Sequence, residues 1–280
     1  MKILRTVDEL RRALETPRAQ GTIGLVPTMG ALHEGHVSLM RAARGECTTV
    51  VASLFVNPVQ FGDPADLQAY PRDEATDAQI ATAAGVDILF APAADEVYRP
   101  GHATWVDVEG PAVGLEGAFR PGHFRGVATV CLKLFLMVEP DRAYFGQKDA
   151  QQVAVVSQLV RDLNVTVEIR VVPTVRGADG LALSSRNVRL SSAERARALA
   201  IPRALDAGLA AARAGRDPVP AATAMLTGLD VDYVAVADFS GRPTLAIAAR
   251  AGRTRLIDNV RLDDDLVAPI MSEREPQHGQ

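Results

Sequence analysis

The sequence predicts an α/β fold, in which a parallel β-sheet has helices on both faces and is followed by a smaller α+β domain. Two observations support this prediction. Short apolar runs alternate with helical stretches over about the first 175 residues, as in strands joined by crossover helices. After about Gly177 the chain becomes rich in alanine and arginine and then shows three strand-like runs in succession. We therefore predict two domains, residues 1–176 and 177–280, which a chain of 280 residues allows.

Strands of the first domain are predicted by short apolar runs that end at strand-breaking residues. Ile23–Val26 has the pattern of a buried strand that Pro27 ends. Thr49–Val56 is rich in β-branched residues and stops at the Asn57-Pro58 pair. Three further strands are expected at Asp87–Phe90, Ala143–Phe145 and Val165–Val172.

Helices are predicted where apolar residues recur with the helical period between these strands. The expected helices are His36–Ala43, Asp73–Ala84, Val127–Val138 and Asp149–Leu163. Ligands on a parallel sheet bind at the carboxyl ends of its strands, near the point where the strand order reverses. Polar loops that directly follow a strand are therefore the candidates for chemistry.

The second domain is predicted to combine helices with a short run of strands. Ser191–Gly215 is helical in pattern, with a break or kink at Pro202. A Gly- and Pro-containing link at Gly215–Pro220 leads to another helix. Strands are expected at Val231–Phe239, Thr244–Ala249 and Arg255–Val260, and a frayed polar tail at Ser272–Gln280.

Composition excludes several classes of function. The net charge of −4 argues against a general nucleic-acid surface, because such surfaces are usually basic. The longest apolar run, Val127–Val138, is too short to cross a bilayer, and the amino terminus is not of signal-peptide type. Cys47 and Cys131 lack metal-ligand spacing and are expected in the core. The sequence thus predicts a cytoplasmic protein without nucleic-acid or membrane partners.

The first candidate loop, PTMGALHEGH, directly follows the first of these strands. Gly30 and Gly35 allow the backbone to turn and to approach a ligand closely. His33 and His36 are three residues apart at a helix start, so both rings can lie on one face. A helix amino terminus attracts anions, and imidazoles donate hydrogen bonds to phosphate oxygens. The pattern favours a phosphate site over two unrelated histidines.

Two further loops also follow strands. Asn57 and Gln60 offer neutral amides that can bind hydroxyl and carboxylate groups, although an Asn-Pro loop is more often only a turn. Lys148 follows Gly146 and precedes a helix that Asp149 could cap. Lysine is scarce here, with only Lys2, Lys133 and Lys148 among 30 basic residues, so a lysine at a strand end favours a phosphate contact over a surface turn.

Two remaining segments are weaker candidates. Ser184, Ser185 and Arg186 could clamp an oxyanion, although such a run is more often a helix-capping loop. The Gly- and Arg-rich stretch Gly114–Gly126 is left open between a mobile lid, a subunit contact and a plain loop. The sequence contains no zinc spacing, Walker A, GxSxG or GxGxxG motif.

The four loops together resemble a known family. PTMGALHEGH, FVNPVQFG, FGQKDAQQ and DGLALSSRN, in this order, are similar to the pantothenate synthetase (pantoate–β-alanine ligase) family of the HIGH-type nucleotidyl-transfer superfamily. Tyr70-Pro71-Arg72 and Arg255–Asn259 also match, so the resemblance spans nearly the whole chain. Departures are small: Leu183 stands where the family often has Met, and Ala150 where a bulkier residue is common.

The resemblance implies a fold and a reaction. The first domain would be Rossmann-like and bind ATP and pantoate, and the second would be a smaller lid domain. The carboxylate of pantoate would attack the α-phosphorus of ATP to give pantoyl adenylate and pyrophosphate. The amine of β-alanine would then displace AMP and give pantothenate. The family uses ATP as a substrate with Mg²⁺, and works as a cytoplasmic homodimer.

The resemblance also implies roles for individual residues. His36, as the family's proton donor, would act with His33, Lys148 and Arg186 in catalysis. Gln60, Gln152 and Asn57 would bind substrate, and no side chain is assigned to the metal. The implied ATP-binding residues are Met29, Gly30, Ala31, Leu32, His33, Glu34, Gly35, His36, Gly146, Gln147, Lys148, Asp149, Val175, Leu183, Ser184, Ser185 and Arg186.

Two alternatives of different class remain at this point. A nucleotidylyltransferase that adenylates a phosphorylated acceptor would share the histidine pair and the lysine. Its acceptor pocket should be cationic, whereas Gln60 and Gln152 are neutral. A non-catalytic nucleotide sensor would be expected to lack polar groups of the motifs, and all of them are present.

Overall fold

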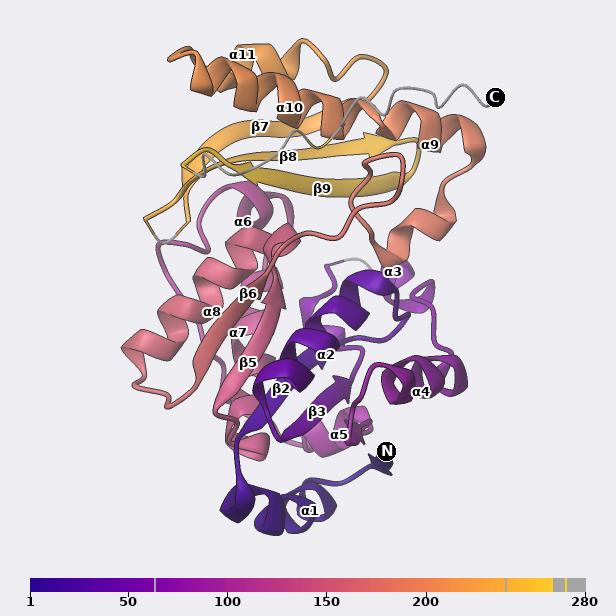
Figure 1. Cartoon of the computed structure of the whole chain (residues 1–280), viewed down its shortest axis with the longest axis vertical. Coiled ribbons are helices and arrows are strands. Elements are labelled where there is room, and N and C mark those ends of the chain that lie inside the picture. The colour runs from indigo at the N-terminus through magenta and orange to yellow at the C-terminus, as the bar shows by residue number, and fades with distance from the viewer. Residues whose placement is uncertain (63, 240, 264–269, 271–280) are drawn as a thin grey trace, which may run out of the picture. The chain divides into compact units, whose positions relative to one another are not determined.

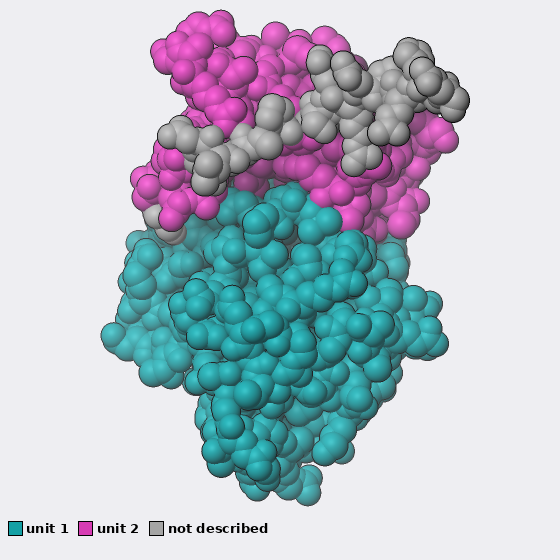
Figure 2. Space-filling view, viewed as in Figure 1, with its two compact units in different colours: residues 1–175 teal, residues 176–280 magenta. Residues whose placement is uncertain are grey.

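The computed structural model describes residues 1–62, 64–239, 241–263 and 270. The chain divides into two compact units, Met1–Val175 and Arg176–Gln280 (Figure 2). The first holds a parallel sheet and the second a small antiparallel sheet, so the predicted fold class is confirmed. No helix among the described residues is long and apolar enough to span a membrane.

The sheet of the first unit has six strands in the order β1-β4-β3-β2-β5-β6, and every registered pair is parallel (Figure 1). The order runs from β2 outward through β3 to β4, and then returns to β5 and β6 on the other side of β2. The reversal lies between β2 and β5, where a ligand site is expected at the carboxyl ends. The strands are β1 (Lys2–Leu4), β2 (Ile23–Thr28), β3 (Thr49–Leu54), β4 (Ile88–Phe90), β5 (Arg142–Gly146) and β6 (Glu168–Val172).

Helices cover both faces of this sheet, as the alternation of side chains requires. Leu25 and Val51 pack on one face with α1, α7 and α8, whereas Val26 and Val50 pack on the other with α2 and α4. The long helices are α1 (Val7–Gln20), α2 (Glu34–Glu46), α4 (Glu74–Ala83), α7 (His123–Val138) and α8 (Ala150–Asp162). The short helices are η1 (Pro58–Gln60), α3 (Pro64–Gln68), α5 (Ala94–Val97), α6 (Leu115–Phe119) and η2 (Gln147–Asp149).

The second unit packs its helices on an antiparallel sheet of order β7-β8-β9. Its core combines apolar residues of α10, such as Leu205 and Leu209, with Leu245 and Ile247 of β8. The strands are β7 (Asp230–Asp238), β8 (Pro243–Ala251) and β9 (Thr254–Arg261). The helices are η3 (Ser185–Arg189), α9 (Ser192–Ala198), α10 (Ala200–Arg213) and α11 (Pro218–Thr223).

Pro27 does not end β2, contrary to the prediction. The carbonyls of Thr22 and Thr28 accept hydrogen bonds from the β3 side, and the carbonyl of Ile23 accepts one from the β5 side. Because the backbone polar groups of successive residues in a strand point alternately to its two neighbours, the nitrogen of Pro27 points toward β5. The registered pairing with β5 stops at Leu25, so the missing N–H costs no ladder bond and the strand continues to Thr28.

Proline also sets the division of the predicted long helix, but at an earlier residue. Helix α9 ends at Ala198 and α10 begins at Ala200. Pro202 has no N–H to donate to the Ala198 carbonyl, so it occupies the first turn of a new helix, where amide groups need no helical acceptor.

Other boundaries also differ from the predictions. Helix α7 begins four residues before the expected Val127, at His123, and the stretch Gly114–Gly126 contains α6, so it is not a plain loop. Strand β6 begins at Glu168, three residues later than expected. The expected tail at Ser272–Gln280 lies outside the described residues.

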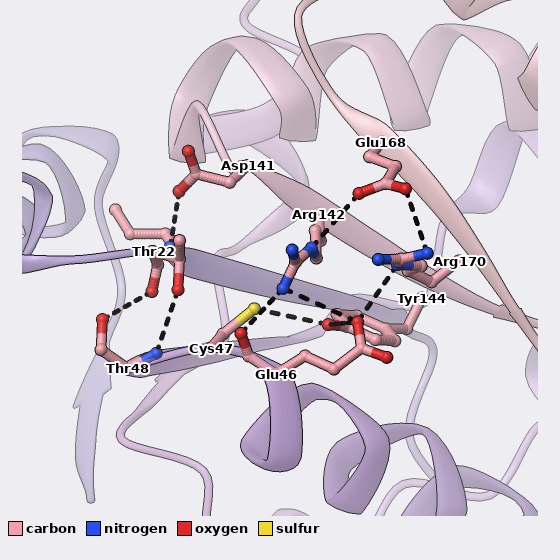
Figure 3. Close-up of polar contacts among 10 residues, drawn as sticks. Thr22, Glu46, Cys47, Thr48, Asp141, Arg142, Tyr144, Glu168 and Arg170 are labelled. Carbon is pink, nitrogen blue, oxygen red and sulfur yellow. Dashed lines mark hydrogen bonds and ion pairs between the residues drawn. The ribbon is translucent and has the colours of Figure 1, made fainter.

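The carboxyl-terminal end of α2 is fixed to β5 and β6 by a polar network (Figure 3). The hydroxyl of Tyr144 donates to Glu46 Oε2 at 3.0 Å, and Arg142 donates to the Glu46 carbonyl at 2.8 Å. Arg170 lies 3.1 Å from the same carboxylate. This network anchors the far end of the helix whose first residues form the candidate site.

Candidate active site

The loop from Met29 to His33 connects β2 to α2 and is held by a buried carboxylate from α4. Asp77 is 3% exposed and accepts from the backbone N–H of Ala31 at 3.0 Å and of Leu32 at 2.7 Å. Both Gly30 and Ala31 have positive φ, at 86° and 50°. A side chain at Gly30 would meet Asp77 at 2.8 Å, so glycine lets the loop lie against its anchor.

The two histidines are part of the first turn of α2. Residue His33 is the N-cap, and its Nδ1 accepts from the Gly35 N–H at 3.1 Å. The Nδ1 of His36 accepts from the His33 N–H at 3.3 Å. Because a backbone N–H can only donate, each Nδ1 is unprotonated and each neutral ring carries its hydrogen on Nε2. The pair, with centroids 4.2 Å apart, therefore offers two Nε2–H donors.

Both imidazoles are neutral near neutral pH. Burial lowers the pKa of His33 to about 4, and the positive charge of Lys148 acts in the same direction while Asp149 opposes it. Burial, followed by the charges of His33 and Lys148, lowers the pKa of His36 to about 3. Each ring can thus donate a hydrogen bond from Nε2–H to a phosphate oxygen while carrying no charge of its own.

Lys148 supplies the positive charge beside these rings. It lies in η2, directly after β5, and its side chain is 19% exposed. Its Nζ is 3.7 Å from Asp149 Oδ1. The expectation that Asp149 caps α8 is wrong: the residue stands at the N-cap position, but its side chain makes no capping hydrogen bond.

Asn57 and Gln60 follow the carboxyl end of β3, and Gln60 reaches Met29 of the histidine loop. Gln60 is 8% exposed, its Oε1 accepts from Asn57 Nδ2 at 3.1 Å, and its Nε2 lies 2.8 Å from Met29 Sδ. A Cβ on Gly126 would come within 2.8 Å of the Gln60 Cα, so glycine allows α7 to pack directly on η1. The structure thus brings Gln60 and the histidine loop together.

The adjacent glutamines of α8 differ in their surroundings. Gln151 is buried and its Oε1 accepts from Glu116 N, while Nε2 donates to the carbonyls of Pro111 and Gly114. Gln152 is only partly buried, and within the described residues its amide has no hydrogen bond. Gln151 therefore holds the stretch that leads into α6, and Gln152 is the glutamine that can bind a ligand.

The serine loop belongs to the second unit and has its own anchors. The Ser184 Oγ accepts from the Arg186 N–H at 3.3 Å and caps η3. Arg176, which is partly buried, forms a bidentate pair with the buried Asp258, at 2.6 and 3.0 Å, and donates to the Gly180 carbonyl. Asp179 accepts from Arg195 at 2.9 Å and from the Leu181 N–H at 3.2 Å. Ser185, Leu183 and Arg186 are all partly buried.

The remaining predicted residues are placed as follows. Glu34 is exposed and pairs with Arg41 at 2.5 Å, so its side chain faces away from the loop interior. Gly146 precedes η2 with open space where a Cβ would stand, and Val175 is the last residue of the first unit and partly buried. Gly35 and Gln147 are partly buried on the first turns of α2 and η2.

Sequence reasoning missed several residues that support the site. Asp77 acts on a loop 45 positions away and lies in a helix without a distinctive motif. Tyr98 donates from its hydroxyl to Asn57 Oδ1 at 3.0 Å. It was missed because it is 41 positions from Asn57 and lies in no recognisable motif. Asp258 belonged to a matched motif, but only the structure shows that it pairs with Arg176.

No group of three or more His, Cys, Asp or Glu side chains among the described residues is arranged to hold a metal ion. Both Cys47 and Cys131 are free and buried, as expected for core residues. Burial raises the pKa of the Cys131 thiol to about 12, so that group is not a nucleophile. Among the described residues, the candidate loops of the first unit offer hydrogen-bond donors and the ammonium of Lys148.

A family model described as pantoate-beta-alanine ligase matches residues 2–261. Pantothenate synthetase of Moorella thermoacetica is 50% identical over an alignment of 280 positions, which covers 94% of this chain and 99% of that protein. The pantothenate synthetase of Cereibacter sphaeroides is 52% identical over an alignment of 275 positions, which covers 92% of this chain and 98% of that protein.

Solved structures agree with the sequence relatives. The crystal structure of pantothenate synthetase from Thermus thermophilus has a TM-score of 0.88 at 46% identity and covers 94% of this chain and 99% of that one. Pantoate-beta-alanine ligase from Francisella tularensis, complexed with β-γ ATP and β-alanine, has a TM-score of 0.81 at 35% identity and covers 94% and 98%.

Proposed function

We propose roles for these residues from one premise: the chain belongs to the pantoate–β-alanine ligase family. Its reaction is the ATP-dependent ligation of pantoate and β-alanine to pantothenate, with pantoyl adenylate as the intermediate and with pyrophosphate and AMP as the other products. The observation that most supports the assignment of roles is the pair of neutral imidazoles beside Lys148, at the reversal point of the sheet.

The first step needs charge neutralisation more than it needs a nucleophilic side chain. The carboxylate of pantoate forms a bond to the α-phosphorus of ATP, and the bond from that phosphorus to the pyrophosphate oxygen breaks. Two negatively charged reactants must meet, so the enzyme has to align them and stabilise the transferring oxygens. His33 and His36 donate through Nε2–H, and Lys148 supplies the cation.

We assign the nucleotide site to the residues that the family motifs match. In the first unit these are Met29 to His36, Gly146 to Asp149, and Val175; in the second they are Leu183 to Arg186. Ser184, Ser185 and Arg186 offer hydroxyls and a guanidinium, which suit phosphate oxygens. In this assignment the first unit binds ATP and pantoate, and the second contributes the serine loop.

Pantoate is assigned to Gln60 and Gln152, and Asn57 positions the first of them. The four hydrogen-bonding positions of the Asn57 amide are all filled by protein groups, so Asn57 holds Gln60 and does not itself contact substrate. Gln152, in contrast, has its amide available. Neutral amides suit an acceptor that carries a hydroxyl and a carboxylate and no phosphate.

Mg²⁺ is proposed to accompany ATP. Because no protein cage of three or more ligands is present among the described residues, phosphate oxygens and waters would hold most of its coordination sphere, as is usual for this ion. The ion would neutralise phosphate charge when bound. A cytoplasmic homodimer is likewise proposed from the family, and sedimentation of the purified chain tests the dimer.

The decisive experiment is ATP–pyrophosphate exchange with a panel of carboxylic acids and phosphorylated acceptors, followed by addition of β-alanine. Exchange should depend on pantoate, and AMP should be released when β-alanine is added. Exchange with a phosphorylated acceptor but not with pantoate would favour a nucleotidylyltransferase. Binding of ATP without any exchange would favour a nucleotide sensor.

The two neighbouring glutamines provide a residue-level test of the pantoate assignment. Gln152→Ala should raise the KM for pantoate about fivefold, the value of one lost hydrogen bond, and leave the KM for ATP within twofold. Gln151→Ala should mainly lower thermal stability, because four acceptor and donor contacts around Glu116 are lost. A larger effect of Gln152→Ala on ATP would remove that residue from the pantoate site.

A further inference from the structure

The amide of Asn57 can have only one orientation. Its Nδ2 donates to the Gly126 carbonyl at 3.1 Å, and its Oδ1 accepts from the Val59 N–H at 3.3 Å. A backbone carbonyl cannot donate and a backbone N–H cannot accept, so exchanging the oxygen and the nitrogen would break both bonds. Asn57 is 1% exposed, so bulk solvent does not compensate for that loss.

This orientation determines which end of the Gln60 amide is free for a ligand. The second hydrogen of Asn57 Nδ2 is donated at 3.1 Å, so the Gln60 atom that receives it must be the oxygen. The Nε2 group of Gln60 then faces the opposite way, toward Met29 Sδ, which is a weak acceptor. Gln60 therefore offers a ligand N–H donors and keeps its carbonyl for Asn57.

Tyr98 is the outer member of this chain of hydrogen bonds. Its hydroxyl lies 3.0 Å from Asn57 Oδ1 and must donate, because that oxygen only accepts. Burial raises the pKa of Tyr98 to about 12, which keeps the donor proton in place. The ring is held by His102 and Trp105, with centroids 5.0 and 6.1 Å away, and by Lys133 Nζ at 5.7 Å.

We propose that Tyr98 is a positioning residue for the pantoate site. Through Asn57 it holds the Gln60 amide with its N–H group, and not its carbonyl, toward the substrate. The inference rests on the proposed function, since it assumes that Gln60 binds pantoate. It adds a rule of specificity: the substrate atom at Gln60 is an oxygen that accepts a hydrogen bond, either a carboxylate oxygen or a hydroxyl oxygen.

The first test compares two tyrosines whose hydroxyls each donate a hydrogen bond. Tyr98→Phe keeps the ring and removes the donor, and should raise the KM for pantoate about fivefold while the KM for ATP and kcat stay within twofold. Tyr144→Phe removes a buried hydroxyl that donates to Glu46 at the opposite end of α2, and should leave the KM for pantoate unchanged. Equal effects of Tyr98→Phe on ATP and pantoate would overturn the proposal.

A double-mutant cycle shows whether Tyr98 acts through Gln60. In a Gln60→Ala background, Tyr98→Phe should change the KM for pantoate by less than about 1.5-fold, because the group it positions is gone. A fivefold effect in both backgrounds would mean that Tyr98 supports the fold in general, and the proposal would be wrong.

The unaltered enzyme provides a test that does not depend on the folding of a variant. In a ¹⁵N-labelled sample the side-chain NH₂ signals of Gln60 should shift when pantoate is added, and those of Asn57 should not. Unshifted Gln60 signals during active exchange would overturn the inference alone. Absence of pantoate-dependent exchange in the same sample would overturn the proposed function together with it.

Discussion

Two polar loops of this molecule, Met29–His36 in the first unit and Asp179–Asn187 in the second, are stabilised in different ways. In the first loop the buried carboxylate of Asp77 accepts two backbone N–H groups from beneath, so the path of the loop itself is fixed. In the second loop a partly buried ion pair, Arg176 with Asp258, fixes the base. The contacts of the chain beyond that base include the Ser184 cap, Asp179 and the Asn187 amide, which donates to the Ala182 carbonyl.

In the first loop the hydrogen-bonding groups themselves are held in fixed orientations. In the second loop the contacts fix mainly the point where the loop joins the rest of the unit. The histidine rings have one nitrogen each committed to the backbone, so their donors have fixed directions. A donor that is already oriented stabilises developing charge without reorganisation. The serine loop continues into the 3-10 helix η3, whose hydrogen bonds have poorer geometry than those of the α-helix that carries the histidines.

The anchor of the serine loop gives the largest expected effect. Asp258→Ala leaves the guanidinium of Arg176, which is 17% exposed, without its carboxylate partner, and should lower the free energy of unfolding of the second unit by about 3 kcal/mol, the lower end of the range for a buried pair. Asp179→Ala breaks the ion pair with Arg195, which is more exposed than the pair of Arg176 with Asp258. It should lower the free energy of unfolding by no more than about 1 kcal/mol. Urea unfolding of both variants checks this, and equal losses would contradict the proposed difference between base and loop.

The cation next to the histidines should dominate the rate. Lys148→Ala is expected to lower pantoate-dependent ATP–pyrophosphate exchange on the order of 10²–10³-fold, the value of a charge that stabilises transferring oxygens. The circular dichroism spectrum should be unchanged. Lys2→Ala, at an exposed strand end, is the matched control and should exchange normally. Near-normal exchange by Lys148→Ala would refute the phosphate role.

Removing the carboxylate that anchors the histidine loop should have an intermediate effect on activity. Asp77→Asn can accept only one of the two N–H groups and turns its own NH₂ toward the other, so kcat/KM for ATP should fall about tenfold. Asp73→Asn changes a carboxylate that caps the same helix through the Thr76 N–H, and should leave kcat/KM unaltered. An Asp77→Asn variant with full activity would show that the loop keeps its path without this anchor.

Acid should destabilise the two units unequally. Burial gives His33, His36 and His123 pKa values of about 4, 3 and 4, below the ordinary 6.5. The unfolded chain then binds more protons between about pH 4 and 6.5, so this stabilisation is complete above pH 6.5 and is lost as the pH falls. The expected loss from pH 7 to 5 is on the order of 1 kcal/mol per ring.

Amide hydrogen exchange measured at pH 7 and pH 5 shows which of the two units acid destabilises. Amides of β2 and β5 should lose protection at pH 5, corrected for intrinsic exchange, whereas those of β8 should not. The described part of the second unit contains no histidine, and the window lies above the titration of the surface carboxylates. Equal loss of protection in both sheets would contradict the assignment of neutral rings to the first unit.

Local sequence pattern predicted most of the sheet and the loops that follow its strands. Strands β2, β3, β4 and β5 contain runs of apolar residues with few alternatives, and their order along the chain with helices between them implies parallel pairing. Strand β1 was missed because three residues, two of them exposed, give no period. The predicted break at Pro27 was wrong because the effect of a proline depends on which neighbour its nitrogen faces.

The site was predictable in its binding groups and much less so in their supports. The histidines, Lys148 and the serines form local motifs next to strand ends. Asp77 and Tyr98 reach the site from 45 and 41 positions away, and no local pattern distinguishes them from any buried acid or tyrosine. Gln151 and Gln152 are adjacent and identical in type, and only the packing of α8 shows which amide is already used.

The commitment of both Nδ1 atoms to backbone amides has a consequence for how protons move through the site. An imidazole relays a proton by taking it on one nitrogen and releasing it from the other, and neither ring can do so without breaking the first turn of α2. The proton set free when the amine of β-alanine becomes an amide must therefore leave by another route, through the departing nucleotide or through solvent. The histidine pair would take part in the ligation as a fixed dipole and not as a conductor of protons.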